Sequence, residues 1–465
     1  MGDIFKYNLK PLIKFLKILS PTQGGGHKQI RKADLAALAA AKNAANATGE
    51  PPFLKGKLNR DKLLLGTTIF YDAEFIRPQD IKNIADAGFD FLITEASGGF
   101  RDMLARECEA NGLALISKDE SLPSGASIGP ALASGKDLFG DYRLIPAHAG
   151  DTAGDEPHAS LFESMGRYYE LYNEKFPQKF LFCNLFPAGT LPKRLGAKNY
   201  KDYIEKFVEQ VPCDFISLDQ YPFFSVRFMQ RAAFAIALHT YDTVADACRK
   251  SGRDFWLYLQ TQGHWFDGIY DLPSYAQISW QAYTALAYGA KCLMHISYTP
   301  VWGSNAYAMV DDRGRLTEQY LYAKRLNKEM AALSPIYMKY ENLGLLPAKA
   351  NRDESVMKTA HKRQIKSSKM QGFKGIEPVE GVNSVSGALV GYFKEKAGEG
   401  FALMAVNSAG LEKIHTSNKI IVRLKFDCEV LIYQADQEVK KIEKTRQVKL
   451  DLGGGQGAFL TIRKL

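Results

Sequence analysis

Apolar runs and amphipathic segments alternate between residues 63 and 335. The runs are short and rich in β-branched and aromatic residues, whereas the segments between them carry apolar residues at helical spacing. The runs expected to form strands are 63–71, 89–94, 113–117, 144–147, 180–185, 215–218, 255–260 and 292–297. Eight units of strand and helix are the number that closes a parallel barrel. The pattern therefore predicts an α/β fold of the (β/α)8 TIM-barrel type.

The pattern changes after Pro335, where helical periodicity stops and residues alternate between apolar and polar. The expected strands there are 388–393, 401–407, 419–426, 430–433, 448–452 and 458–462. Such short alternating runs predict a C-terminal antiparallel β-sandwich. We therefore expect three segments: an N-terminal arm and linker at 1–60, the barrel at 61–335, and the β-sandwich at 336–465.

The composition is that of a globular protein, with 46% hydrophobic and 24% charged residues among 465. No apolar stretch is long enough for a membrane span. The apolar residues near the N-terminus come in short pairs, so a secretory signal is not expected and a cytoplasmic location is. Six cysteines lie scattered without a Cys-x-x-Cys pair, which predicts buried thiols rather than disulfides or a zinc site.

The formal net charge of +9 has its basic excess in the N-terminal arm and between Lys339 and Lys374. No zinc-finger pattern or interleaving of basic and aromatic residues accompanies it, so no nucleic-acid partner is expected. No phosphate-binding glycine motif occurs either, which argues against nucleotide chemistry. We expect no cofactor.

Polar and aromatic residues follow the predicted strands at their carboxyl ends, where barrel enzymes have their active sites. Carboxylates, amides and aromatic rings together are typical of a sugar site, because rings stack on pyranose faces and polar groups hold hydroxyls. Any exposed loop is polar, but two of only four tryptophans fall in these loops. The candidate substrate-binding residues are Glu95, Asp155, Asn184, Tyr221, Gln260, His264, Trp265, His295, Tyr298 and Trp302.

Five short motifs occur in order at barrel spacing. They are Gly154-Asp155-Glu156-Pro157, Asn184-Leu185-Phe186-Pro187, Ser217-Leu218-Asp219-Gln220-Tyr221-Pro222, Trp256-Leu257-Tyr258-Leu259-Gln260 and Ala287-Tyr288-Gly289-Ala290-Lys291. With them, residues 63–335 resemble bacterial β-galactosidase-like glycoside hydrolases of the clan A barrel type. The resemblance implies that Glu156, within Asp-Glu-Pro after strand four, is the acid/base. It also implies a glutamate nucleophile closing strand seven, where this chain has Gln260.

Hydrolysis of a glycosidic bond normally needs two carboxyl groups, and an amide cannot replace either. The best second carboxylate is Asp219, at the end of strand six, with Glu95 and Asp119 as further candidates. A separation from Glu156 of about 5 to 5.5 Å would imply retention of configuration, and about 6.5 to 9.5 Å inversion. The sequence thus predicts a glycoside hydrolase with Glu156 and Asp219 as catalytic residues and a carbohydrate as substrate.

Other interpretations remain open for several of these residues. Gln260 and Asn184 could fix loops, His295 could be a core histidine, and Tyr221 and Tyr298 could orient a carboxylate or pack. His148, Asp151, Asp155 and His158 lack the spacing of a metal motif, so no metal is expected.

Two other functions also stay open. One is a barrel that binds glycans without cleaving them, which the missing glutamate at Gln260 favours. The other is a Schiff-base lyase that uses Lys118, although the flanking Asp119 and Glu120 suggest an ordinary exposed lysine.

Overall fold

The computed structural model describes most of the chain beyond residue 57. The described residues are 58, 60–70, 76–94, 98–119, 121–140, 147–224, 227–263, 271–300, 307–350, 362–367, 371–409, 416–435 and 437–465, with the backbone alone at 98, 227 and 228.

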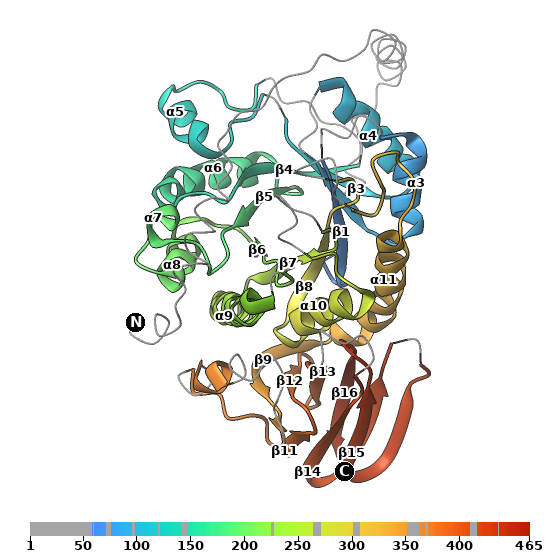
Figure 1. Cartoon of the computed structure of the whole chain (residues 1–465). Coiled ribbons are helices and arrows are strands. Elements are labelled where there is room, and N and C mark those ends of the chain that lie inside the picture. The colour runs from blue at the N-terminus through green and yellow to red at the C-terminus, as the bar shows by residue number, and fades with distance from the viewer. Residues whose placement is uncertain are drawn as a thin grey trace.

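A closed barrel of eight parallel strands forms the larger part of the molecule, in the order in which the strands occur along the chain (Figure 1). The strands are β1 (Leu64–Ile69), β2 (Phe91–Thr94), β3 (Ala114–Ser117), β4 (His148–Asp155), β5 (Phe180–Leu185), β6 (Phe215–Asp219), β7 (Asp254–Gln260) and β8 (Ala290–Ile296). The predicted barrel fold is confirmed.

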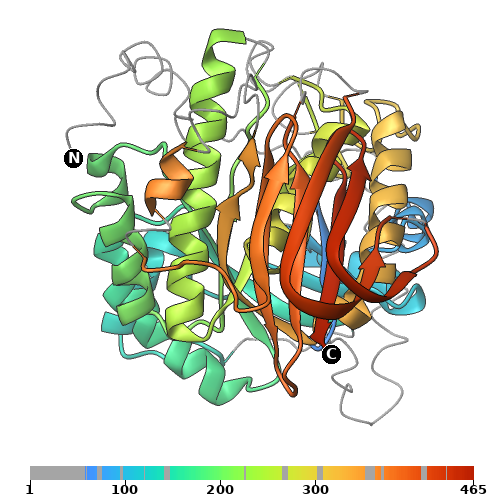
Figure 2. The same ribbon diagram turned by 90° about the horizontal axis from the view of Figure 1, so that it is seen from below.

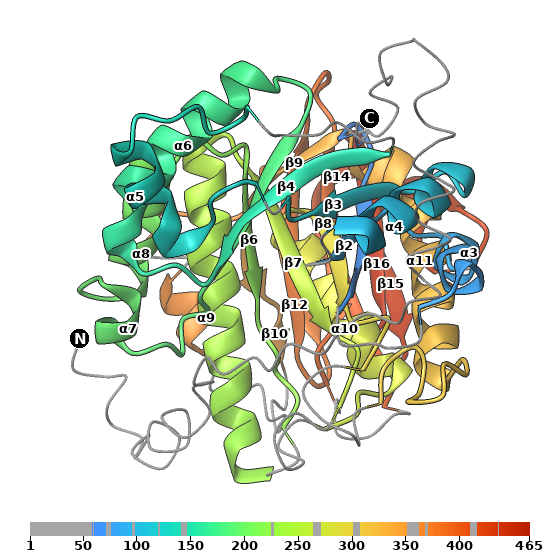
Figure 3. The ribbon, with the colours of Figure 1, turned by 90° about the horizontal axis from the view of Figure 1, so that it is seen from above.

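Helices surround the barrel, as the view from above shows (Figure 3). They are α3 (Pro78–Asp86), α4 (Gly98–Ala110), α5 (Ile128–Ala133), α6 (Phe162–Lys175), α7 (Pro192–Leu195), α8 (Tyr200–Gln210), α9 (Arg227–Ser251), α10 (Tyr275–Ala287) and α11 (Glu318–Tyr337). Local sequence fixes several of their starts. Ser274 and Gln277 form a capping box at α10, and the Thr317 side chain accepts the Gln319 N–H at α11.

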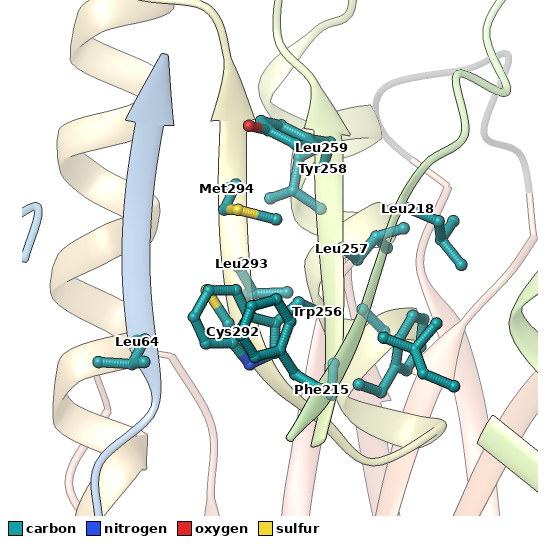
Figure 4. Close-up of a cluster of buried hydrophobic side chains, with 14 of the residues drawn as sticks. Leu64, Phe215, Leu218, Trp256, Leu257, Tyr258, Leu259, Cys292, Leu293 and Met294 are labelled. Atoms are coloured by element: carbon teal, nitrogen blue, oxygen red, sulfur yellow. The ribbon is translucent and has the colours of Figure 1, made fainter. Parts of the chain in front are cut away.

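Aromatic rings fill the lower part of the barrel. Trp256 stacks on Phe215 with ring centroids 3.9 Å apart (Figure 4). It also contacts Phe91 and Phe182 on strands across the interior. Because side chains alternate along a strand, the residues two and four positions beyond Trp256, Tyr258 and Gln260, face the interior as well. The carboxyl ends of the strands therefore lie above an apolar floor.

Strand β4 differs from the sequence prediction. We expected a strand at 144–147 followed by a loop from Gly150, but the strand is His148–Asp155, and residues 141–146 lie outside the described part. Its Gly, Ala, Thr and Asp residues give no β-type pattern, so pairing with β3 and β5 fixes it instead. Glycine is needed at Gly150, because a Cβ there would lie 2.2 Å from the Phe180 carbonyl oxygen. As a result Asp155 ends the strand and Glu156 directly follows it.

The C-terminal strands form one sheet in the order β10-β11-β14-β16-β13-β12-β9, with β15 beside β14. The strands are β9 (Tyr340–Pro347), β10 (Lys349–Ala350), β11 (Val379–Ser384), β12 (Ala388–Glu395), β13 (Phe401–Asn407), β14 (Asn418–Tyr433), β15 (Lys440–Leu452) and β16 (Gly457–Lys464). All pairs but β10–β11 are antiparallel. One apolar cluster joins Val422 and Leu450 to Val390 and Leu403 from the other half of the sheet, as in a sandwich. The predicted antiparallel β-sandwich is confirmed, although two expected strands are one, β14.

Helix α10 lies between the barrel and the C-terminal sheet (Figure 2). It contacts β7 and β8 on one side and β12, β13 and β16 on the other. All its residues from Ile278 to Ala287 are buried. The sheet approaches closely at Gly391, where a Cβ would lie 2.2 Å from the Ala287 carbonyl oxygen. The apolar residues at this contact belong to the same core as the barrel.

All six cysteines are buried and free. No helix in the described part of the chain is long and apolar enough to cross a membrane.

A first prediction concerns the barrel floor. An added Cβ at Gly66 on β1 would lie 2.3 Å from the Phe91 ring, which cannot move freely in a packed core. Gly66→Ala is expected to lower the free energy of unfolding by about 1 to 3 kcal/mol, measured by urea denaturation. Gly381→Ala in β11 is the control, because a Cβ there meets nothing within 4 Å. Equal stability of the two variants would contradict this packing.

Candidate active site

The side chain of Asn184 connects the carboxylate-bearing ends of two strands, β4 and β6. Its amide nitrogen donates to Asp219 Oδ1 at 2.8 Å and to Asp155 Oδ1 at 3.3 Å. Its amide oxygen accepts the Ser217 hydroxyl at 3.1 Å, and its backbone oxygen accepts the Glu156 N–H at 2.8 Å. Asn184 is buried on β5, between β4 and β6. The structure thus brings Asp155, Glu156 and Asp219 together at the carboxyl end of the barrel.

Glu156 holds an uncommon backbone conformation directly after β4. Its φ is 45°, a left-handed value that residues other than glycine adopt at a cost. One carboxylate oxygen, Oε2, accepts a hydrogen bond from Arg194 on α7 at 3.0 Å, and the side chain keeps 27% of its surface exposed. The Arg194 guanidinium also lies over the Phe186 ring, 4.8 Å from its centroid. Glu156 is therefore positioned by a fixed cation yet open to solvent and ligand.

The surroundings of Glu156 favour its protonated form. Burial raises the pKa of its carboxyl well above the usual range, and the charges of Asp219 and Asp155 raise it further. Arg194 acts in the opposite direction. A carboxylic acid that stays protonated near neutral pH can donate a proton, which a carboxyl with an ordinary pKa does poorly.

Asp219 has the opposite balance of hydrogen bonds. Burial raises its pKa, but hydrogen bonds from Asn184 and Tyr221 and the charge of Arg194 lower it. These donors stabilise the carboxylate form. The two acids thus differ. Hydrogen-bond donors stabilise the carboxylate form of Asp219, whereas neighbouring negative charges destabilise the carboxylate form of Glu156.

Gln260, at the position where the resembled family has its nucleophile, fixes loops. Its Oε1 accepts the Phe223 N–H at 2.9 Å, and its Nε2 donates to the carbonyl oxygens of Phe223 and Asp271 at 3.0 Å each. The side chain of Gln281 on α10 in turn bonds both backbone groups of Gln260. These contacts match the loop-fixing interpretation, and a role in sugar binding stays a prediction.

Two predicted substrate contacts lie away from this cluster. His295 has no exposed surface and packs edge-on against Phe89, and burial lowers its pKa to about 3, so the ring is neutral. Tyr298 is equally buried and donates to Asp80 Oδ1 on α3 at 2.9 Å. Both side chains face the helical layer, so the expectation that His295 shares the rim with Glu156 is not met. Alternation along β8 explains this, because Met294 pairs with the inward-facing Tyr258 and its neighbour therefore points outward.

The residues considered as metal ligands or as a further catalytic carboxylate contact other side chains. His148 Nδ1 lies 2.9 Å from Lys179 Nζ, and Asp151 accepts the Tyr172 hydroxyl at 2.6 Å. Asp119 pairs with Arg101 at 2.6 Å. In the part of the chain that the structure describes, no group of three or more His, Cys, Asp or Glu side chains could hold a metal ion.

The remaining predicted residues are Lys118 and four residues outside the described part of the chain. Lys118 is half-buried directly after β3. Glu95, His264, Trp265 and Trp302 lie outside the described residues.

Two residues of the site were missed in the sequence. Ser217 faces the barrel interior two positions before Asp219, so strand alternation could have indicated it. Arg194 belongs to a short helix in the loop after β5. No spacing rule links such a loop residue to Glu156.

No protein-family model and no curated protein matches this chain. Among solved structures, it is similar to a β-galactosidase from Bacillus circulans sp. alkalophilus, with 10% identity, coverage of 87% of this chain and 99% of that one, and a TM-score of 0.45. It is also similar to a family 39 glycoside hydrolase from Bacteroides cellulosilyticus WH2 (10% identity, 89% and 83% covered, TM-score 0.43). A β-xylosidase from Caulobacter crescentus CB15 is a third (12% identity, 88% and 97% covered, TM-score 0.39). These structural neighbours are glycoside hydrolases, but at such low similarity no residue role is transferred from them.

Gln260 provides a prediction about the site. In Gln260→Glu, a carboxylate would face the carbonyl oxygens of Phe223 and Asp271, so burial and repulsion would raise its folded-state pKa. The charged form is destabilising, so the loss of unfolding free energy relative to wild type should grow with pH above about 4.3, the unfolded pKa of glutamate. We expect a loss of about 1 to 3 kcal/mol at pH 8 and a smaller one at pH 5, measured by urea denaturation. A variant as stable as wild type at pH 8 would show that Gln260 does not fix these loops.

Proposed function

We propose that the protein hydrolyses a glycosidic bond, with Glu156 as general acid and Asp219 as the second carboxylate. The observation that supports this most is the cluster around Asn184, where one carboxyl group has a strongly raised pKa beside another that is held by hydrogen-bond donors. Two carboxyl groups in different environments are the arrangement that glycoside hydrolysis uses.

In this mechanism the protonated Glu156 gives its proton to the glycosidic oxygen, and the bond from that oxygen to the anomeric carbon breaks. Asp219 either attacks the anomeric carbon directly or takes a proton from an attacking water. Glu156 is then ionised, and Arg194, already bonded to its Oε2, stabilises the carboxylate that forms. Asn184 and Tyr221 keep Asp219 oriented for its part.

A barrel that binds glycans without cleaving them is the second candidate. The observation in its favour is Gln260, an amide whose hydrogen bonds all go to loop backbone. Because Gln260 supplies no carboxylate, hydrolysis would need Asp219 as the partner of Glu156.

The two carboxyl groups can be separated by leaving-group chemistry. Glu156→Gln should lower the rate by about 10² to 10⁴ on a glycoside with a poor leaving group. The loss should be much smaller on an activated aryl glycoside, because a good leaving group departs without protonation. Asp219→Asn should impair both substrates alike, since attack or water activation is always needed. The measurement is kcat/KM for both substrates.

Glu205→Gln is the matched control, because Glu205 is exposed on α8 and pairs with Lys201 at the surface. It should leave both rates unchanged. Equal loss on both substrates in Glu156→Gln would contradict the acid role. Binding without cleavage by the wild type, across a broad panel of glycosides, would replace hydrolysis with the glycan-binding function.

Arg194 gives a prediction about pH dependence. Activity needs Glu156 protonated and Asp219 ionised, so it should fall as pH rises through the pKa of Glu156 and as pH falls through that of Asp219. Arg194 lowers both pKa values. Arg194→Leu should therefore move both limbs of the kcat/KM profile to higher pH. Lys193→Leu, beside it on α7 and exposed, is the control and should move neither limb. An unshifted profile in Arg194→Leu would show that Glu156 does not set the alkaline limb.

A further inference from the structure

A shallow hollow of about 630 Å³ lies on the outer face of the C-terminal sheet, away from the barrel. It is lined by residues of β11, β14 and β15: Glu380, Arg423, Leu424, Lys425, Arg446 and Gln447. None of them belongs to the carboxylate cluster on β4, β5 and β6. Any ligand here would bind independently of the site proposed for hydrolysis.

The lining is basic but not uniformly so. Arg423 and Lys425 are exposed on β14, and among the described residues neither has an ion-pair partner within 4.0 Å. Arg446 is held by Asp427 at 2.8 Å. Glu380 and Gln447 add a carboxylate and an amide. The hollow thus combines two available cations with groups that exchange hydrogen bonds with neutral hydroxyls.

The backbone beneath the hollow is rigid and leaves room above it. Val422, one position before Arg423, points to the opposite face of β14 and is buried in the sheet's own core. Arg423 pairs across the sheet with Gly381, where an added Cβ would meet nothing within 4 Å, and with Gln447 on the other side. The register of β14 shifts between Arg423 and Cys428, which bends the strand at this point. The guanidinium is therefore presented on a fixed strand beside an open position.

We propose that this hollow binds an acidic polysaccharide, with a uronic acid unit whose carboxylate meets Arg423 and Lys425. A guanidinium bonds a carboxylate in bidentate fashion, and a neighbouring ammonium adds charge. The hydroxyl groups of the same sugar donate to Glu380 and bond Gln447. A single-stranded nucleic acid fits less well, because no aromatic ring among the described residues lines the hollow for base stacking.

The test is affinity electrophoresis of the full chain in native gels containing polygalacturonate, at about 0.15 M salt so that non-specific attraction is screened. The wild type should be retarded by polygalacturonate and not by neutral dextran. Arg423→Gln combined with Lys425→Gln should weaken binding about tenfold or more, the loss expected for charged hydrogen bonds. The control Lys324→Gln with Lys328→Gln removes the same charge from the exposed face of α11 and should leave binding unchanged.

Glu380→Gln separates sugar recognition from simple charge attraction. Loss of a negative charge strengthens attraction to any polyanion, whereas exchange of the carboxylate for a neutral amide weakens the hydrogen bonds from sugar hydroxyls. We expect the second effect to prevail and binding to weaken. Stronger binding in Glu380→Gln, equal losses in the β14 and α11 variants, or no retardation of the wild type would each overturn the proposal. So would a DNA duplex that binds as tightly and depends on Arg423 and Lys425 to the same extent.

Discussion

The hydrogen bonds of one amide side chain hold the candidate site together. Asn184 has two N–H donors and places them on Asp219 and Asp155, so these two carboxylates are brought close despite their mutual repulsion. Its side chain gives no donor to Glu156, which is bonded only at the backbone by this residue. Glu156 is therefore exposed to the two neighbouring charges with only the hydrogen bond from Arg194, among those described, to offset them. The difference between the two carboxyl groups of the proposed mechanism follows from this distribution of donors.

Strand alternation places that amide on an apolar floor. Phe180, Phe182 and Asn184 lie two positions apart on β5, and Phe215, Ser217 and Asp219 do so on β6. The lower residues of each series contact Trp256, on which Phe215 is stacked. Water is thus excluded from below the carboxylates, and burial becomes the largest cause of the raised pKa of both Glu156 and Asp219. The aromatic core stabilises the barrel and sets the electrostatics of its rim at the same time.

Sequence patterns predicted the barrel well wherever strands are apolar. The expected bounds of β5, 180–185, are those observed, because Phe180–Leu185 is a run of strand formers that is buried along nearly its whole length. The sequence patterns failed at β4, whose residues do not form an apolar run. They also failed in the first part of β15, where most residues are charged or polar and no apolar alternation occurs. Three strands, β9, β10 and β11, were not expected at all.

Predictions for single side chains depended on knowing which way each one points. Glu156 was predicted from the resemblance of its Asp-Glu-Pro motif and Asp219 from its place at the end of strand six. Both lie at the carboxyl end of the barrel, because strand ends converge there whatever their exact bounds. His295 lies near the end of β8 and Tyr298 directly beyond it, but their side chains face the helices. That orientation can be predicted only when the register of the barrel is known. The structural role of Gln260 is invisible in the sequence, since its partners Phe223 and Asp271 come from two different loops.

The C-terminal sheet and the rim of the barrel are connected through α10. The sheet covers one side of this helix, and the Ser279 hydroxyl on it donates to the Gly455 carbonyl oxygen at 3.1 Å. Two residues along from Ser279, Gln281 bonds the backbone of Gln260. Gln260 in turn holds Phe223, four residues beyond Asp219. A sheet without catalytic groups thus contributes to the site, because it fixes the helix from which the loops around Asp219 are held.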